Sequence, residues 1–142
     1  MQEHDFHIPK RIIRLDEKGV WPSSKSSIFE QDKSPFTKEH LVKKIAPNEK
    51  YICFSPIDNF YLLSSEFENN DVMMELGAMD QIDSNLCLII GDFGIGSDSY
   101  IVLDYSENQL NPCVKRLAWK DGGNYWEKIS NSVDEFLDVL KL

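Results

Sequence analysis

Two apolar runs separated by a glycine-rich turn stand out in the pattern of the chain. Residues 86–90 are continuously apolar, and residues 100–105 combine β-branched and aromatic side chains. Runs of this length and composition are typical of strands, and an unbroken apolar run indicates that both faces of its strand are covered. The intervening residues 91–98 include three glycines, which permit a tight reversal of the backbone. The pattern therefore predicts a hairpin.

The segment after this hairpin predicts a third strand and then a helix. Residues 112–119 form the expected strand, and a helix is predicted over residues 133–140. Ser132 and Glu135 match a capping box, in which a serine caps the helix and a glutamate three residues later reaches back. Four apolar residues share one face of this helix: Val133, Phe136, Leu137 and Leu140.

Weaker signals fill the first half of the chain. They predict, in order, a strand or helix start at 9–15, a loop at 23–35, a helix from Thr37 to about Pro47 with Leu41, Val42 and Ile45 on one side, strands at 51–54 and 60–63, and a helix at 70–79. No internal repeat or linker divides the sequence. All the elements together predict a single α+β domain over residues 1–142, in which a mostly antiparallel sheet is covered by helices.

The composition predicts where the protein is located. With 142 residues and 42% hydrophobic content, the chain is long enough to bury a core. No apolar stretch approaches the ~18 residues of a membrane span. Residues 1–5 are polar and acidic, unlike the start of a signal peptide. We therefore expect a cytoplasmic protein that does not bind a membrane.

Cysteine usage argues against disulfides and against a metal site. The three cysteines, Cys53, Cys87 and Cys113, are odd in number and never occur at CxxC spacing. Cys53 and Cys87 lie inside apolar runs, which is typical of buried thiols in a reducing compartment. Only His4 and His7 fall at ligand spacing, and they lie close to the first residue. We expect no metal and no cofactor.

Charge is distributed unevenly along the chain, whose formal net charge is −9. Residues 1–50 hold 10 Lys or Arg and 8 Asp or Glu, whereas residues 51–142 hold 5 and 16. The 64 residues from Tyr51 to Val114, the cation-free span, include eleven acids and no Lys, Arg or His. A sheet built from this span would project a negative field, which repels nucleic acid and attracts basic partners. Ordinary acidic solubility is the alternative explanation.

Motif matches in the glycine-rich turn are better explained without catalysis. Asp92-Phe93-Gly94 spells the metal-binding triplet of kinases, but the other kinase motifs are missing. The glycines do not follow GxGxxG spacing, and a strand rather than a helix comes next. Asp92 and Asp98 flank the turn, but calcium loops need several ligands at set offsets. We expect these carboxylates to stabilise the turn, and no Ser, His or Cys constellation predicts an enzyme.

Aromatic residues gather on both sides of residues 120–124. Trp119 and Trp126 are predicted to close the core between the sheet and the last helix. The alternative is that these residues and Tyr125 form a partly exposed patch beside the acidic sheet. Aromatic side chains in such patches are frequent anchors of protein–protein contacts.

The order of the C-terminal elements resembles the SMI1/KNR4 family, also called the SUKH superfamily. The strand Ile101-Val102-Leu103-Asp104 is similar to the family's "ILDL"-like strand. The segment WEKISNSVDEFL at residues 126–137 is similar to a tryptophan that leads into the family's "IADSFEEFL". The resemblance covers residues 86–142. Residues 1–50 lack the family's usual "LPEDYKEFL…NGG" opening and are either a diverged version of it or a different N-terminal elaboration.

The resemblance implies a binding protein. Bacterial members of the family are typically immunity proteins that neutralise polymorphic toxins, often nucleases, and fungal members regulate cell-wall glucan synthesis. We expect a non-enzymatic immunity protein that binds a basic toxin domain through these residues: Asp58, Asp80, Asp83, Asp92, Asp98, Trp119 and Tyr125. A regulatory or scaffold module without a toxin partner is the alternative. A third possibility, a small-molecule sensor or hydrolytic enzyme, would require a deep pocket with convergent polar groups.

Overall fold

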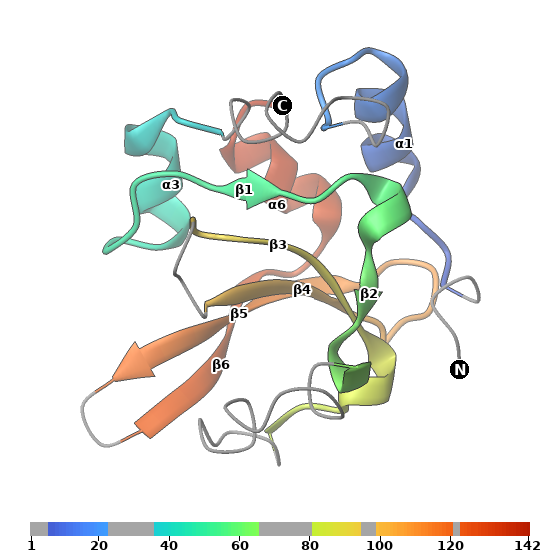
Figure 1. Ribbon diagram of the computed structural model, residues 1–142, viewed down its shortest axis with the longest axis vertical. Helices are drawn as coiled ribbons and strands as arrows, with labels where there is room; N and C mark the ends of the chain where they lie inside the picture. Colours follow the sequence, from blue (N-terminus) through green and yellow to red (C-terminus); the bar gives the residue numbers. More distant parts are fainter. Residues whose placement is uncertain (1–5, 23–35, 66–80, 95–98, 121–122) are drawn as a thin grey trace.

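The computed structural model describes residues 6–22, 36–65, 81–94, 99–120 and 123–142, and within them an antiparallel sheet carries helices on one face (Figure 1). The strands are β1 (Cys53–Phe54), β2 (Tyr61–Leu62), β3 (Cys87–Asp92), β4 (Tyr100–Asp104), β5 (Cys113–Lys120) and β6 (Gly123–Ser130). The helices are α1 (Lys10–Glu17), α3 (Glu39–Ile45) and α6 (Val133–Val139), with short 3-10 helices η2 (Ile57–Asn59) and η4 (Ser84–Leu86). The strand order is β1-β3-β4-β5-β6, and β2 also pairs with β3. The α+β fold class is therefore confirmed.

The central strands are buried on both faces, as the apolar run at 86–90 predicted. On the helix side, Leu88 and Leu103 belong to one cluster with apolar residues of α1, α3 and α6. On the opposite side, which we call the far face, Ile89 and Val102 belong to a second cluster. Each large side chain that is fully buried contributes about 1.5–3 kcal/mol. Both faces therefore stabilise the sheet.

The helix layer has α6 between α1 and α3 (Figure 1). In α1, the signal at 9–15 proves helical, because Ile12 and Leu15 lie three residues apart and both enter the core. Gly19, with φ +76°, follows the C-cap residue Lys18 and ends the helix. Of the two predictions for residues 9–15, a strand or the start of a helix, the helix is therefore correct.

The predicted buried side of the second helix is confirmed, but its start is not. Leu41, Val42 and Ile45 are buried in α3. The N-cap residue is Lys38 rather than Thr37, and no side chain caps the helix. The first turn of α3 therefore depends on packing and on Glu39, whose charge suits the positive end of the helix.

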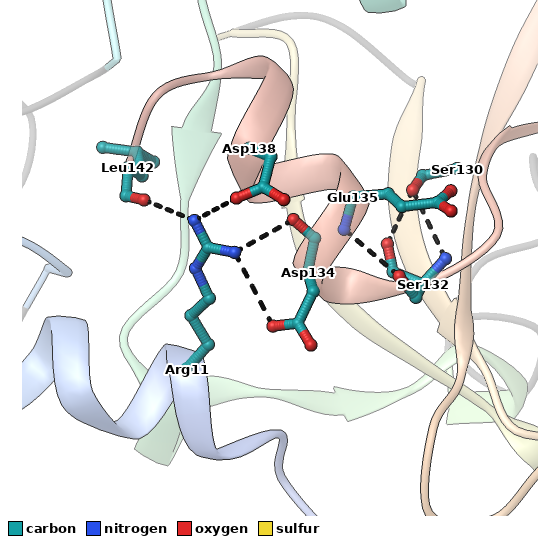
Figure 2. Close-up of polar contacts among 7 residues, drawn as sticks. All are labelled: Arg11, Ser130, Ser132, Asp134, Glu135, Asp138 and Leu142. Carbon is teal, nitrogen blue, oxygen red and sulfur yellow. Dashed lines mark hydrogen bonds and ion pairs between the residues drawn. The ribbon is translucent and has the colours of Figure 1, made fainter.

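The cap of the last helix is half of the predicted capping box. Ser132 Oγ accepts the backbone N–H of Glu135 at 3.1 Å, as expected (Figure 2). The Glu135 carboxylate, however, accepts the N–H of Asn131 at 3.3 Å rather than that of Ser132. The Ser132 N–H lies 3.4 Å from Ser130 Oγ instead. A neighbouring serine therefore takes the role that the pattern assigned to the glutamate.

The hairpin and the third strand are confirmed, whereas other expectations change. Strand β6 was not predicted, because polar residues interrupt its apolar positions and it forms an edge of the sheet. The strands expected at 51–54 and 60–63 contain only two residues each, as β1 and β2. The loop at 23–35 and the helix at 70–79 lie outside the described residues. No helix in the described part of the chain is long and apolar enough to cross a membrane.

Candidate functional site

The aspartates predicted to bind a partner lie in separate places. Asp80 and Asp98 fall outside the described residues. Asp58 lies in η2, Asp83 caps η4, and Asp92 ends β3. Since η4 leads directly into the start of β3, Asp83 and Asp92 lie at opposite ends of that strand. These three carboxylates therefore do not form one cluster.

Asp92 stabilises the turn after β3. Its Oδ1 accepts the backbone N–H of Gly94 at 2.8 Å, which is the turn contact expected from the sequence. Burial raises the pKa of the Asp92 carboxyl, and this hydrogen bond opposes the rise. Gly94 has φ +127°, and a Cβ on it would lie 2.6 Å from the ring of Tyr51. In the described part of the turn, Asp92 thus has a structural role.

Three acids of the cation-free span are exposed among the described residues: Asp58, Asp83 and Glu107. Asp83 Oδ1 accepts the N–H of Asn85 at 3.0 Å, which holds the carboxylate at the start of η4. Glu107 Oε2 lies 3.9 Å from Lys128 Nζ, a long and exposed ion pair that contributes little. These side chains carry the negative charge of the span to the surface.

A buried ion pair that the sequence analysis missed lies near Asp83. Asp104, only 3% exposed, lies with its Oδ2 2.7 Å from Lys115 Nζ. Its Oδ1 accepts the N–H of Ser106 at 2.9 Å. Burial raises the pKa of Asp104, but the hydrogen bonds from Lys115 and Ser106 outweigh burial and lower that pKa. Asp104 is therefore a charged carboxylate whose charge is balanced within the fold.

Two thiols flank Asp104 in the sheet. The strand register places Cys87 opposite Asp104 on β3 and Cys113 opposite it on β5. Burial raises the pKa of both thiols, and the charge of Asp104 raises it further. A thiol must lose its proton to act as a nucleophile or metal ligand. No group of three metal-binding side chains occurs among the described residues.

An open hollow of about 500 Å³ lies over the Asp104–Lys115 pair, and we call it the polar hollow. It is lined by Gln81, Ile82, Asp83, Ser84, Asp104, Ser106 and Lys115. Asp83, one of the predicted partner residues, thus lines a concave site. A signal for this site was present in the sequence, because Asp104 interrupts the apolar pattern where β4 ends.

The aromatic residues lie on the β5–β6 hairpin. β4 pairs with β5 only across Cys113–Arg116, and the outer part of the hairpin extends beyond it (Figure 1). Tyr125 is half-buried there, with its hydroxyl 3.4 Å from Glu127 Oε2. Trp119 lies opposite Asn124 on the same hairpin, and its side chain is outside the described part.

The prediction that Trp126 closes the core between sheet and last helix is wrong. Trp126 lies opposite Leu117 and packs with it on the far face, away from α6. Successive side chains of a strand point to opposite faces, and the register of β6 gives Trp126 the face that Leu117 occupies. Its backbone N–H donates to Gln81 Oε1 at 2.9 Å, which covers part of this edge strand.

Arg116 is a second buried charge that the sequence analysis missed. It is 8% exposed, its Nη2 lies 3.2 Å from Glu127 Oε2, and its guanidinium lies 5.7 Å from the ring centre of Phe93. Its Nε is buried without a hydrogen-bond partner. Such an orphaned donor costs free energy, so the ion pair and the ring contact must offset it.

Arg11 joins the first and last helices (Figure 2). Its Nη2 lies 2.6 Å from Asp138 Oδ1 and donates to the backbone carbonyl of Leu142 at 2.7 Å. Its Nη1 donates to the Asp134 carbonyl at 3.1 Å and lies 3.7 Å from Asp134 Oδ1. Two exposed acids of α6 are therefore engaged by α1.

A scan against protein-family models, a search of the curated proteins and a search of the solved structures each find no match to this chain.

Proposed function

We propose that this protein is a non-enzymatic immunity protein that neutralises a nuclease-type toxin by binding its basic cleft. The observation that carries the proposal is the position of charge in the cation-free span. Its buried carboxylate, Asp104, is balanced by Lys115, whereas Asp83 and Glu107 are exposed. The span therefore presents the charge of Asp83 and Glu107 outward, while its buried Asp104 is balanced by Lys115, the first residue after the span.

The polar hollow offers a place for a cationic side chain of the toxin. Asp83 supplies a carboxylate at this concave surface, and Ser84 and Ser106 line it. A nuclease needs cations to bind phosphate groups, and a Lys or Arg that enters the hollow is no longer available to nucleic acid. The SMI1/KNR4 resemblance of residues 86–142 supports the same function, because bacterial members of that family neutralise toxins by binding.

The test is direct binding to the toxin domain encoded beside the gene for this protein. We expect tight binding that weakens as salt rises, and loss of nuclease activity in the complex. Absence of salt-sensitive binding to that domain would refute the immunity function. A regulatory scaffold of the SMI1/KNR4 type would be indicated if the neighbouring gene encodes no toxin.

A pair of charge variants locates the interface. Asp83→Asn combined with Glu107→Gln is expected to slow association about tenfold, because exposed charges act mainly on the association rate. Glu17→Gln changes an exposed acid on α1 and serves as the control. If both proteins bind the toxin domain at the wild-type rate, the acidic surface is not the interface.

A further inference from the structure

A second concave site lies on the helix side of the molecule and has the opposite charge. A cleft of about 380 Å³ opens between α1, the loop after β4 and the start of α6. We call it the basic cleft, and it is lined by His7, Pro9, Lys10, Arg11, Arg14, Leu110, Asn111, Val133 and Asp134. A protein of net charge −9 thus carries one site whose charged lining residues are mainly cationic, with three cations and one carboxylate.

The cations of this cleft are not all neutralised. Arg11 is engaged by Asp134, the carboxylate that lines the cleft, and by Asp138. Lys10 and Arg14 are exposed, and neither forms an ion pair with any described residue. Two positive side chains therefore remain available at the cleft.

The positions of Lys10 and Arg14 favour an anion between them. They lie four residues apart on α1, where side chains are neighbours and like charges repel. The first turn of α1 contains no acidic residue, so the helix dipole adds to the positive potential. A bound carboxylate would reduce the repulsion between Lys10 and Arg14 and would offset the positive potential at the start of α1.

The cleft is held in place by its surroundings. Ile12 and Leu15 bury the other side of α1, and Arg11 ties the helix to α6. The Tyr105 hydroxyl donates to the carbonyl of His7 at 2.8 Å, which fixes the segment before the helix. A ligand would thus meet cations on a preorganised helix, which lowers the entropic cost of binding.

An apolar contact next to the cations indicates what kind of anion fits. Leu110 is 72% exposed beside the cleft. The side chain of Asn108 accepts the N–H groups of Leu110 and Asn111 at 2.9 and 3.0 Å, so the loop that presents the leucine is braced. A bare phosphate makes no use of an exposed leucine, whereas a peptide with an apolar residue beside its carboxylate does. A long polyanion would also be repelled by residues 51–142.

We infer that the basic cleft binds an acidic segment of a protein partner, with an Asp or Glu carboxylate between Lys10 and Arg14 and an apolar side chain against Leu110. This site lies on the helix side, whereas the polar hollow lies beside Asp104 on the far face. The inference therefore does not depend on the proposed toxin interface.

The test uses a fluorescent peptide of alternating Asp and Leu as the probe. Fluorescence anisotropy is expected to show binding that weakens with added salt. Lys10→Gln combined with Arg14→Gln should weaken binding about tenfold, because two charge-assisted contacts are lost. Lys43→Gln combined with Lys44→Gln removes the same charge from α3 and should leave binding unchanged. Leu110→Ser should weaken binding of this peptide but not of an Asp and Gly peptide.

Each other outcome counts against the inference. Absence of salt-sensitive peptide binding, or equal weakening by the α1 and α3 variants, would overturn it. If a single-stranded oligonucleotide binds at least as tightly as the peptide, the inference is overturned, and the ligand of the cleft is a nucleic acid rather than a protein segment. Circular dichroism of each variant is the control for folding. We expect the fold to be retained, because the substituted side chains are exposed.

Discussion

Arg11 Nη2 lies 2.6 Å from Asp138 Oδ1. This ion pair connects α1 to α6. The same guanidinium also donates to two backbone carbonyls near the ends of α6. This side chain therefore adds a polar connection to the apolar packing that α1 and α6 share, and it borders the basic cleft.

Removing this connection should destabilise the fold moderately. Arg11→Ala is expected to lower the free energy of unfolding by about 1–2 kcal/mol, since charge-assisted hydrogen bonds are lost but the site is partly exposed. Urea denaturation measures the change. Lys43→Ala removes an exposed ion pair with Glu39 at 3.6 Å and should cost less than about 0.5 kcal/mol. Equal effects of the two variants would contradict the role of Arg11.

The Asp104–Lys115 pair should make stability depend on pH in a defined direction. The pKa of Asp104 is lowered in the folded state, so its contribution is present above the unfolded pKa of about 3.9. That contribution is lost as the pH falls through the folded-state pKa. The pKa of Lys115 is raised, because the gain from Asp104 exceeds the lowering by burial, so its contribution is lost only as the pH rises through its folded-state pKa.

The variant Lys115→Met tests this pair. At neutral pH it leaves Asp104 buried without its cation, and the free energy of unfolding should fall by about 3 kcal/mol. At acid pH Asp104 becomes protonated, so the difference from the wild type should shrink. Urea denaturation at both pH values measures the two differences. A difference that stays constant or grows in acid would show that the loss comes from packing rather than from charge.

Asp92 should behave in the opposite way, because burial raises its pKa. Its charged form is disfavoured in the folded state, so it destabilises the protein as the pH rises through the folded-state pKa. Asp92→Asn keeps the acceptor for the Gly94 N–H and removes the charge, and it should raise the unfolding free energy at pH 7 but not at pH 3. Asp92→Ala loses the hydrogen bond and should cost about 1 kcal/mol at pH 3. Thermal denaturation at the two pH values distinguishes these variants.

Two glycines should resist substitution for different reasons. A Cβ at Gly91 would lie 2.5 Å from the backbone oxygen of Cys53, whereas one at Gly94 would meet the Tyr51 ring. Either change to Ala should cost about 2 kcal/mol in chemical denaturation. Tyr51→Ala should recover part of the loss at Gly94, where φ is +127°, and none of the loss at Gly91. Recovery at both positions would mean that the two sites are coupled.

The parts of the fold that were predictable from the sequence are those encoded by neighbouring residues. β3 and β4 follow runs of apolar residues, β5 follows the apolar positions within residues 112–119, and α6 follows a spacing of four apolar residues with a serine cap. The edge strand β6 has no such run, because none of its described side chains is fully buried and polar residues separate its apolar positions. The side taken by Trp126 depends on the register of β6 against β5, which no local pattern specifies.

The sequence by itself determined an α+β fold and a cation-free span with eleven acids, because composition and periodicity are local properties of the chain. Only the tertiary structure decided which charges are used inside the fold and which reach the surface. It paired Asp104 with Lys115 across two strands and Arg11 with Asp138 across two helices. It left Asp83 exposed beside the polar hollow and Lys10 exposed beside the basic cleft. Strand register and helix packing set these pairings, and both depend on residues far apart in the chain.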